Sequence, residues 1–487
     1  MSKTIALKKI INVPAILSHL TLLFLFFSCN SEQDRTDSPN IVLINIDDMG
    51  WNDVSFMGSK YYNTPNIDSL AEQGLVFTQG YAASANCAPS RASIHSGKWT
   101  TRHQIYTVDN SDRGKASDRK LIPIKNTTVL DKRFITLSQK FKKQGYITCH
   151  SGKWHLSDDP LEYGFDLNIA GGNQGGPASY YPPFENKILK LKINKGKSEY
   201  LTDLIMEKTL LFLDSVNSPF FLNYSPYAVH TPIHPIDSLI YKYKNKPPYK
   251  GQKNPKYATM VENLDRNIGL LVKKLRARKL FDNTFLIFTS DNGGHYGKIT
   301  MQKPLRAGKG SYYEGGIRVP FFFLWKDKIN SGKNTQIPIS HLDIFPTLMN
   351  LIDDYSMENQ LDGESLLSLI TEGQALAERS FFWHFPIYLQ GYDIKNNENR
   401  DSLFRTRPGS IIRKGDWKLH YYFEDYGIEL YNLKDDISES NNLAESHIDK
   451  RQELMKELTD WWRNTNAPIP TQINSLYKPH QNHGDSL

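Results

Sequence analysis

Short runs of consecutive apolar residues recur along the chain and alternate with helix-like segments. The runs that predict strands are NIVLINI at 40–46, YITCH at 146–150, FFLNYS at 220–225, FLIFTS at 285–290 and VPFFFLW at 319–325. Continuous runs of this length are typical of strands buried on both faces of a parallel sheet. Apolar residues spaced by three or four from Ala258 to Leu275 predict an amphipathic helix between two of these strands. The pattern predicts an α/β sandwich with a large, mostly parallel central sheet.

The pattern changes after about residue 375. Residues 410–423 and 428–433 alternate well enough to predict two antiparallel strands, and a helix-like stretch follows from Ile448 to Arg463. A chain of 487 residues is also longer than one hydrophobic core usually supports. We therefore expect a main domain at residues 40–375 and a small C-terminal α+β subdomain with an antiparallel sheet at 376–487.

The amino terminus has the composition of an export signal. Three lysines precede an apolar run that ends at Ser28, and Cys29 and a polar, acidic stretch follow. A small residue directly before a cysteine resembles a bacterial lipobox, which predicts a signal peptide at residues 1–28, lipidation of Cys29 and a linker at 29–39. The two phenylalanines before Ser28 fit the strictest lipobox poorly, so a plain signal peptide and an uncleaved anchor helix stay as alternatives, the anchor helix being the weakest.

The net charge indicates the kind of substrate, and the cysteine count limits the possible disulfides. Removing residues 1–28 lowers the formal net charge from +7 to +4, because the segment holds three lysines and no acids. This mild excess suits an anionic substrate, and no nucleic-acid-binding motif is present, so we expect no nucleic acid partner. If Cys29 carries lipid, Cys87 and Cys149 remain, and they either form a disulfide or lie buried as small apolar residues.

Carboxylate and amide side chains follow two of the predicted strands. Asp47 and Asp48 end the first strand, and Asp291 and Asn292 follow FLIFTS. Each pair alone is more often a helix cap or a turn. Because ligands bind at the carboxyl ends of the strands of such sheets, these oxygens together predict a site for Ca²⁺ or Mg²⁺.

Basic side chains follow the other strands. His155 and Lys153 come after YITCH, His230 comes after FFLNYS, and Lys309 precedes the last predicted strand. A lone histidine or lysine in such a loop is more often structural or simply solvated. Their common position at strand ends predicts an anion site equipped for proton transfer.

The segment Cys87-Ala88-Pro89-Ser90-Arg91-Ala92-Ser93-Ile94-His95-Ser96-Gly97 resembles the signature of type I sulfatases. In that signature the cysteine, a proline two residues later and an arginine four residues later direct oxidation of the cysteine to formylglycine. Ile94 and Ser96 replace the more usual leucine and threonine. The resemblance runs from Asn40 to about Asn442 and includes the Gly-Lys-Trp-His, His-Thr-Pro, Thr-Ser-Asp-Asn-Gly-Gly and Asp-Ile-Phe-Pro-Thr-Leu motifs.

The resemblance implies an alkaline-phosphatase-like fold and one Ca²⁺ ion per chain. Its ligands would be Asp47, Asp48, Asp291, Asn292 and the formylglycine (3-oxoalanine) made from Cys87. The conversion implies a partner, a formylglycine-generating or sulfatase-maturating enzyme.

The resemblance also assigns roles to the basic residues. The hydrated aldehyde would attack sulfur through one hydroxyl, whose deprotonation Arg91 and the cation favour. Lys153 and Lys309 would balance the charge of the sulfate oxygens, and His230 with Lys309 would protonate the leaving oxygen. His155 would then deprotonate the second hydroxyl, which releases sulfate and restores the aldehyde.

The substrate class follows less directly. Loops at 99–103, 171–184, 383–392 and 404–408 offer aromatic faces and cations that suit a sulfated polysaccharide or its oligosaccharides. We expect an exported, lipid-anchored bacterial sulfatase of the periplasm or outer membrane, acting on an algal polymer such as ulvan or carrageenan ahead of host glycosaminoglycans. A phosphodiesterase or phosphonate hydrolase of the same superfamily is the alternative, which the lack of a recognisable second cluster of metal-binding residues disfavours. A third alternative is a non-catalytic glycan binder with an unmodified Cys87.

Overall fold

The computed structural model describes residues 38–182, 184, 200–357, 360–391 and 398–479. The predicted signal peptide, Cys29 and nearly all of the predicted linker lie outside the described residues. Among the helices of the described ranges, none is both long enough and apolar enough to span a membrane.

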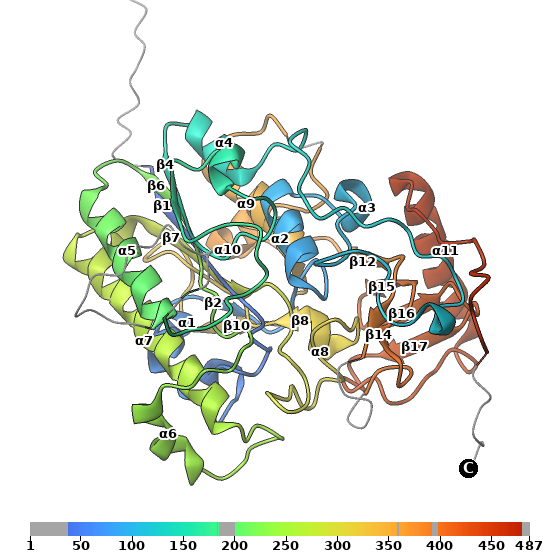
Figure 1. Cartoon of the computed structure of the whole chain (residues 1–487). Helices are drawn as coiled ribbons and strands as arrows, with labels where there is room; N and C mark the ends of the chain where they lie inside the picture. Colours follow the sequence, from blue (N-terminus) through green and yellow to red (C-terminus); the bar gives the residue numbers. More distant parts are fainter. Residues whose placement is uncertain (1–37, 183, 185–199, 358–359, 392–397, 480–487) are drawn as a thin grey trace, which may run out of the picture. The chain divides into compact units, whose positions relative to one another are not determined.

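The central sheet has eight strands in the order β10-β2-β9-β7-β1-β6-β4-β5 (Figure 1). The strands are β1 (Asn40–Ile46), β2 (Leu75–Phe77), β4 (Ile147–Gly152), β5 (Leu167–Ile169), β6 (Phe220–Ser225), β7 (Thr284–Ser290), β9 (Phe322–Leu324) and β10 (Lys333–Thr335). In the middle of the sheet β1 pairs in parallel with both β6 and β7, and β6 pairs in parallel with β4. The predicted α/β class with a mostly parallel sheet is confirmed.

The apolar run at 319–325 does not form the single strand that the sequence predicts. It is divided between β8 (Arg318–Val319) and β9, with Pro320 between them. Proline has no N–H to donate to a ladder, which favours an interruption here. β8 joins a small second sheet with β3 (Gly80–Tyr81) and β11 (Ile339–Ser340), whereas β9 runs antiparallel to β7 in the central sheet.

Helices cover both faces of the central sheet. Val42 and Ile44 of β1 belong to a core that includes residues of α1 (Pro65–Glu72), α5 (Leu201–Ser215) and α7 (Pro255–Ala277). Ile41 and Leu43 point to the other face, whose core includes residues of α2 (Cys87–Ser96), α4 (Leu137–Lys143), α9 (Ile344–Leu351) and α10 (Leu367–Glu372). Successive side chains of a strand face opposite sides, so both faces of β1 must be apolar. This double burial explains the uninterrupted apolar run.

The helix predicted from Ala258 to Leu275 is confirmed and lies within α7. Asn254 caps its first turn by accepting hydrogen bonds from the backbone N–H groups of Lys256 and Tyr257, and Pro255 occupies the first turn. Proline suits this position because the first N–H groups of a helix have no partner inside it. The stripe that includes Leu264 and Ile268 is fully buried, and each such side chain contributes about 1.5–3 kcal/mol.

The C-terminal region forms a separate antiparallel sheet in the order β12-β15-β16-β17. Its elements are β12 (Ser380–Phe385), β15 (Gly409–Lys414), β16 (Trp417–Tyr422), β17 (Ile428–Asn432) and α11 (Ile448–Thr465). The prediction of two strands from 410–433 is wrong, because 410–423 is a hairpin in which Lys414 pairs with Trp417 across Gly415. Gly415 has a φ of 54°, a conformation that glycine adopts without strain. The domain boundary at residue 375 stays a prediction.

Smaller elements complete the described chain. They are α3 (Thr100–His103), α6 (Asp237–Lys244), α8 (Glu314–Ile317), the strand pair β13 (Leu389–Gln390) and β14 (Phe404–Thr406), and 3-10 helices at Ser55–Met57, Ala116–Asp118, Pro160–Tyr163, Phe281–Asn283 and His341–Asp343.

A buried ionic cluster attaches the C-terminal sheet to α8. The Lys418 ammonium of β16 lies 3.0 Å from Glu314 Oε1 and 2.9 Å from Glu439 Oε1. The Glu439 carboxylate in turn accepts a hydrogen bond from the Glu314 backbone N–H at 2.6 Å. Since Glu314 comes five residues after Lys309, this cluster also anchors the loop that carries the predicted catalytic lysine.

Candidate active site

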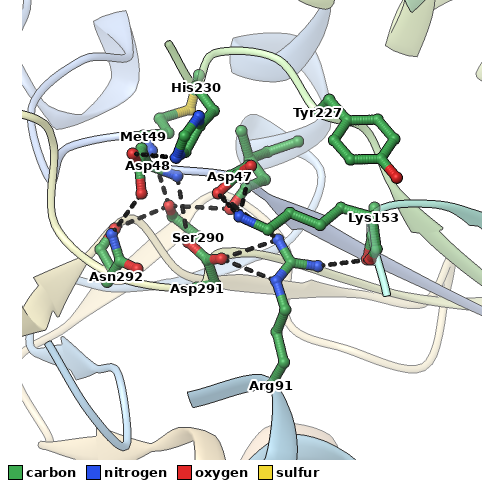
Figure 2. Close-up of polar contacts among 12 residues, drawn as sticks. Asp47, Asp48, Met49, Arg91, Lys153, Tyr227, His230, Ser290, Asp291 and Asn292 are labelled. Carbon is green, nitrogen blue, oxygen red and sulfur yellow. Dashed lines mark hydrogen bonds and ion pairs between the residues drawn. The ribbon is translucent and has the colours of Figure 1, made fainter. Parts of the chain in front are cut away.

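The predicted metal ligands meet at the carboxyl ends of β1 and β7 (Figure 2). The two strands pair in parallel to their last residues, with Ile46 opposite Ser290, so Asp47 and Asp291 leave the sheet side by side. The Asp48 backbone N–H donates to Asp291 Oδ1 at 3.1 Å, and the Asn292 amide donates to Asp48 Oδ1 at 2.8 Å. The parallel register is therefore what gathers four oxygen-bearing side chains from two distant segments.

Helix α2 brings the signature residues to the same point. Cys87 is its first residue, and atoms of Asp47, Cys87 and Asp291 that could bind a metal all lie within 4.8 Å of one another. Arg91 follows one turn later on the same face of the helix. Its Nε donates to Asp291 Oδ2 at 2.9 Å and its Nη1 donates to the Lys153 carbonyl at 2.9 Å. A cysteine and an arginine four residues apart thus both face the carboxylates.

Two lysines balance the charge of the carboxylates. Lys153 Nζ lies 2.8 Å and 2.9 Å from the two oxygens of Asp47, and Lys309 Nζ lies 2.7 Å from Asp48 Oδ2. The Lys153 and Lys309 side chains are almost completely buried. Paired charges interact strongly in a buried site that excludes water, and removing one partner leaves an uncompensated buried charge.

The donor set fits a hard divalent cation. Burial raises the pKa of Asp47 and of Asp291, and a neighbouring carboxylate adds to the effect in each case. Burial acts in the same direction on Asp48, but Lys309 and His230 outweigh it and hold its pKa below the usual range. Within the described residues, Asn292 Oδ1 is buried and has no hydrogen-bond donor. Three carboxylates with an unpartnered amide oxygen among them are a ligand set that Ca²⁺ accepts.

Both predicted histidines are neutral in the resting site. Burial and the Lys309 charge lower the pKa of His230 to about 3. His230 Nδ1 donates to the Thr231 carbonyl at 2.6 Å, so Nε2, which lies 3.6 Å from Asp48 Oδ2, is the nitrogen left to accept a proton. Burial, followed by Lys153 and Arg91, holds the pKa of His155 well below its usual value. The two imidazoles are therefore available as bases.

The two remaining cysteines do not form a disulfide. Cys87 and Cys149 are both free and buried, which decides between the two alternatives that the sequence leaves open. Cys149 lies in β4 within the apolar core, where burial raises the pKa of its thiol. Cys149 therefore has a structural role, and Cys87 alone faces the charged cluster.

A glycine pair that the sequence analysis did not assign to the site lies against both histidines. A Cβ added at Gly175 would be 2.8 Å from His155 Cε1, and one added at Gly176 would be 2.8 Å from His230 Nδ1. The loop around them is fixed by Gln174, whose amide donates to the Tyr227 hydroxyl at 2.9 Å. The two Gly-Gly pairs of the GGNQGG segment could have indicated this contact from the sequence, because a backbone that packs closely against other groups requires glycine.

We expect Gly176→Ala to lower kcat about 10- to 100-fold, because the new methyl group displaces the His230 ring from its position. Sulfate release under saturating substrate measures the effect. Asn173→Ala is the matched control, since Asn173 lies in the same loop and its side chain contacts Asp158 and neither histidine. Equal activities of Gly176→Ala and Asn173→Ala would show that the close contact is irrelevant to turnover.

Comparisons with known proteins agree over most of the chain. The family model described as "Sulfatase" matches residues 39–355, and the model described as "N-sulphoglucosamine sulphohydrolase, C-terminal" matches residues 308–466. A sulfatase of Formosa agariphila is 31% identical over 91% of this chain and 92% of its own length. Human N-acetylgalactosamine-6-sulfatase is 29% identical over 71% of this chain and 68% of its own length.

Solved structures show the same fold. The crystal structure of Ps i-CgsB in complex with k-i-k-neocarrahexaose has a TM-score of 0.70 and 28% identity, covering 88% of this chain and 98% of that one. Its fold, like that of the other sulfatases similar to this chain, is alkaline-phosphatase-like. The family match spans both the strand ends that carry the carboxylates and the helix that carries Cys87 and Arg91. We conclude that this chain belongs to the sulfatase family and is a sulfuric ester hydrolase.

Proposed function

We propose that this sulfatase hydrolyses sulfate esters of sulfated polysaccharides or their oligosaccharides, using formylglycine made from Cys87 and one Ca²⁺ ion. The observation that carries the proposal is the convergence of Asp47, Asp291 and Cys87 within 4.8 Å. Arg91 and Lys153 surround this point with positive charge, as a site for an anionic ester requires.

The carboxylate cluster supports the metal. Asp47, Asp48, Asp291, Asn292 and the modified residue 87 would hold it, and the unpartnered Asn292 Oδ1 would gain a partner. A bound Ca²⁺ ion would polarise a sulfate oxygen and favour the ionised form of a hydroxyl at position 87. Lys153 and Lys309, which balance Asp47 and Asp48, would bind the sulfate oxygens.

The state of Cys87 supports its conversion. Burial raises the pKa of the thiol, although Lys153 and Lys309 act in the opposite direction. An unmodified Cys87 is therefore a protonated, poor nucleophile. Formylglycine at residue 87, once hydrated, would supply one hydroxyl for attack on sulfur and a second one for the release of sulfate.

The histidines move the protons. His155, neutral and buried, would take the proton from the second hydroxyl. His230 Nε2 carries the proton for the leaving oxygen, since the Thr231 carbonyl holds the Nδ1 proton in place. Binding of an anionic ester raises the pKa of His230 toward the range that this role needs.

Relatives support a glycan substrate. Ps i-CgsB binds a neocarrahexaose, and an N-acetylgalactosamine-6-O-sulfatase of Bacteroides thetaiotaomicron is 26% identical over 92% of this chain and 98% of its own length. We favour an algal polymer such as carrageenan or ulvan over a host glycosaminoglycan.

The signal-like residues 1–28 and Cys29 support export and a lipid anchor in the periplasm or outer membrane of a bacterium. A formylglycine-generating or sulfatase-maturating enzyme is the partner that the chain needs before it acts.

Sulfate release from a panel of defined substrates tests the proposal. The panel holds oligosaccharides of carrageenan, ulvan and chondroitin sulfate, together with an aryl sulfate and an aryl phosphodiester. We expect turnover of the aryl sulfate and of at least one sulfated oligosaccharide. Faster turnover of the phosphodiester would favour the phosphodiesterase alternative, and glycan binding with no release of sulfate would favour a non-catalytic binder.

A further inference from the structure

A lysine-rich segment connects β6 to α7. Residues 238–261 contain six lysines and no aspartate or glutamate, in a chain whose basic and acidic residues are otherwise nearly balanced. Two of the six are engaged, since Lys242 pairs with Glu262 at 2.8 Å and Lys246 donates to Asn63 Oδ1 at 3.0 Å. The other four, Lys244, Lys250, Lys253 and Lys256, are exposed and have no ion-pair partner among the described residues.

Two tyrosines accompany these lysines. Tyr241 in α6 has 79% of its surface exposed. Tyr249 is partly buried, and Lys60 Nζ and Lys250 Nζ lie 5.5 Å and 5.6 Å from the centroid of its ring. We call the four unpaired lysines together with Tyr241 and Tyr249 the lysine surface.

The chain topology places the lysine surface at the same edge of the sheet as the active site. β6 ends at Ser225, α7 begins at Pro255, and α7 returns the chain to the start of β7. Because β6 and β7 both run parallel to β1, the connection between β6 and α7 lies at the carboxyl edge, where Asp47 and Asp291 are. Figure 1 shows α6 beside the first turns of α7.

Direct contacts join the two regions. The loop that leaves the metal site after Asn292 packs against the lysine surface, because the Asn254 amide donates to the Lys298 carbonyl at 3.2 Å. Gln252 donates to the Asn52 carbonyl at 2.9 Å, which ties the same segment to the loop that follows Asp48. The segment that carries the lysine surface therefore packs on the loops that follow Asp48 and Asn292.

We propose that the lysine surface binds a sulfated polysaccharide chain beyond the sugar that is being desulfated. The inference rests on the proposed function and extends it to a polymeric substrate. Each exposed ammonium binds an anion weakly, but a linear chain with regularly spaced sulfates engages several at once and raises its effective concentration at the site. The exposed Tyr241 ring offers a face for a sugar ring.

Two alternatives fit the observations less well. The groove beside α6, about 480 Å³ in volume, is lined by three acids, Asp68, Glu262 and Asp265, and by two bases, Lys242 and Arg266. Its mixed charges suit a polyanion less well than the lysine surface does. An anionic membrane would also attract lysines, but surfaces that lie on membranes bury apolar side chains as well. Tyr241 is the sole large apolar side chain of residues 238–261 that is strongly exposed.

The experiment compares two quadruple variants, both made in the Cys87→Ala background so that turnover does not alter the polymer. One variant carries Lys244→Gln, Lys250→Gln, Lys253→Gln and Lys256→Gln. The control carries Lys143→Gln, Lys273→Gln, Lys328→Gln and Lys333→Gln, which remove equally exposed lysines at the opposite edge of the sheet, none ion-paired among the described residues. Calorimetry measures binding of carrageenan polymer, with desulfated carrageenan and phosphatidylglycerol vesicles as comparison probes, and melting temperatures verify folding.

We expect the first variant to bind the sulfated polymer about 10-fold more weakly and the control to stay within about 2-fold of the parent. With Cys87 restored, the ratio of kcat/KM for polymer to that for aryl sulfate should fall about 10-fold in the first variant alone. Equal losses in both quadruple variants, no loss in either, or a loss confined to vesicle binding would each overturn the proposal. Failure of the parent enzyme to cleave any sulfate ester would refute the proposed function, while the binding comparison would still decide whether the lysine surface holds the polymer.

Discussion

Replacement of Cys87 by alanine should abolish hydrolysis of sulfate esters, with a loss on the order of 10⁵-fold in kcat. Cys87 is the first residue of α2 and faces Asp47 and Asp291 at the point where the charges converge. Alanine is smaller than cysteine and suits a helix, so it removes the precursor of the proposed nucleophile with little disturbance of the fold. Cys87→Ser should behave alike, because a single hydroxyl lacks the second oxygen through which the proposed formylglycine hydrate would expel sulfate.

Three measurements check this prediction. Sulfate release gives the loss, the melting temperature verifies the fold, and peptide mass spectrometry reports whether residue 87 has exchanged sulfur for oxygen in the active parent. Cys149→Ala is the control, since it removes the other free, buried thiol and should cost stability but not the chemistry. Full activity of Cys87→Ala, or an active parent with an intact thiol at residue 87, would refute formylglycine as the nucleophile.

The strand ends explain why much of the site was predictable. Long apolar runs indicated which strands are buried, and the polar residues that end β1 and β7 could be expected to meet once those strands were assigned to a parallel sheet. The structure confirms the convergence of Asp47 and Asp291, which strand assignment alone had suggested. Their roles as ligands stay a prediction. Spacing along the sequence does not predict that Cys87 lies in the same cluster. The resemblance to sulfatases does predict it.

Other features depend on contacts that sequence patterns do not encode. The alternating pattern predicts one strand where β15 and β16 form a hairpin, because alternation continues on both sides of Gly415. Lys418 alternates like any polar strand residue, yet it lies buried between Glu314 and Glu439, which are distant from it in sequence. Gly176 lies against the His230 ring, a contact that no spacing in the sequence indicates. In each case a partner remote in sequence determines the role.

Replacement of Asp291 by asparagine should weaken binding of Ca²⁺ about 100-fold or more and lower turnover at limiting Ca²⁺ on the order of 10³-fold. Asp291 Oδ2 accepts from Arg91 Nε at 2.9 Å and Oδ1 accepts from the Asp48 backbone N–H at 3.1 Å. Asparagine keeps the shape but removes the negative charge, and it turns one of these acceptors into a donor. Stripping the parent with a chelator should abolish activity, and titration with Ca²⁺ should restore activity and raise the melting temperature, as expected when a ligand binds only the native state.

Asp343→Asn is the matched control for the Asp291 variant. Asp343 is also a buried carboxylate with an arginine partner, since Arg379 Nη1 donates to it at 2.7 Å, and it also accepts from backbone N–H groups at Ser340 and Glu364. Its loss should lower the melting temperature by a similar mechanism and leave the Ca²⁺ titration of activity unchanged. A Ca²⁺ response that shifts equally in both variants would trace the effect to general destabilisation. Activity of the parent that survives exhaustive chelation would rule out a required metal ion. The raised pKa values of Asp47 and Asp291 would then reflect burial, and Arg91 and Lys153 would balance these two carboxylates without a cation.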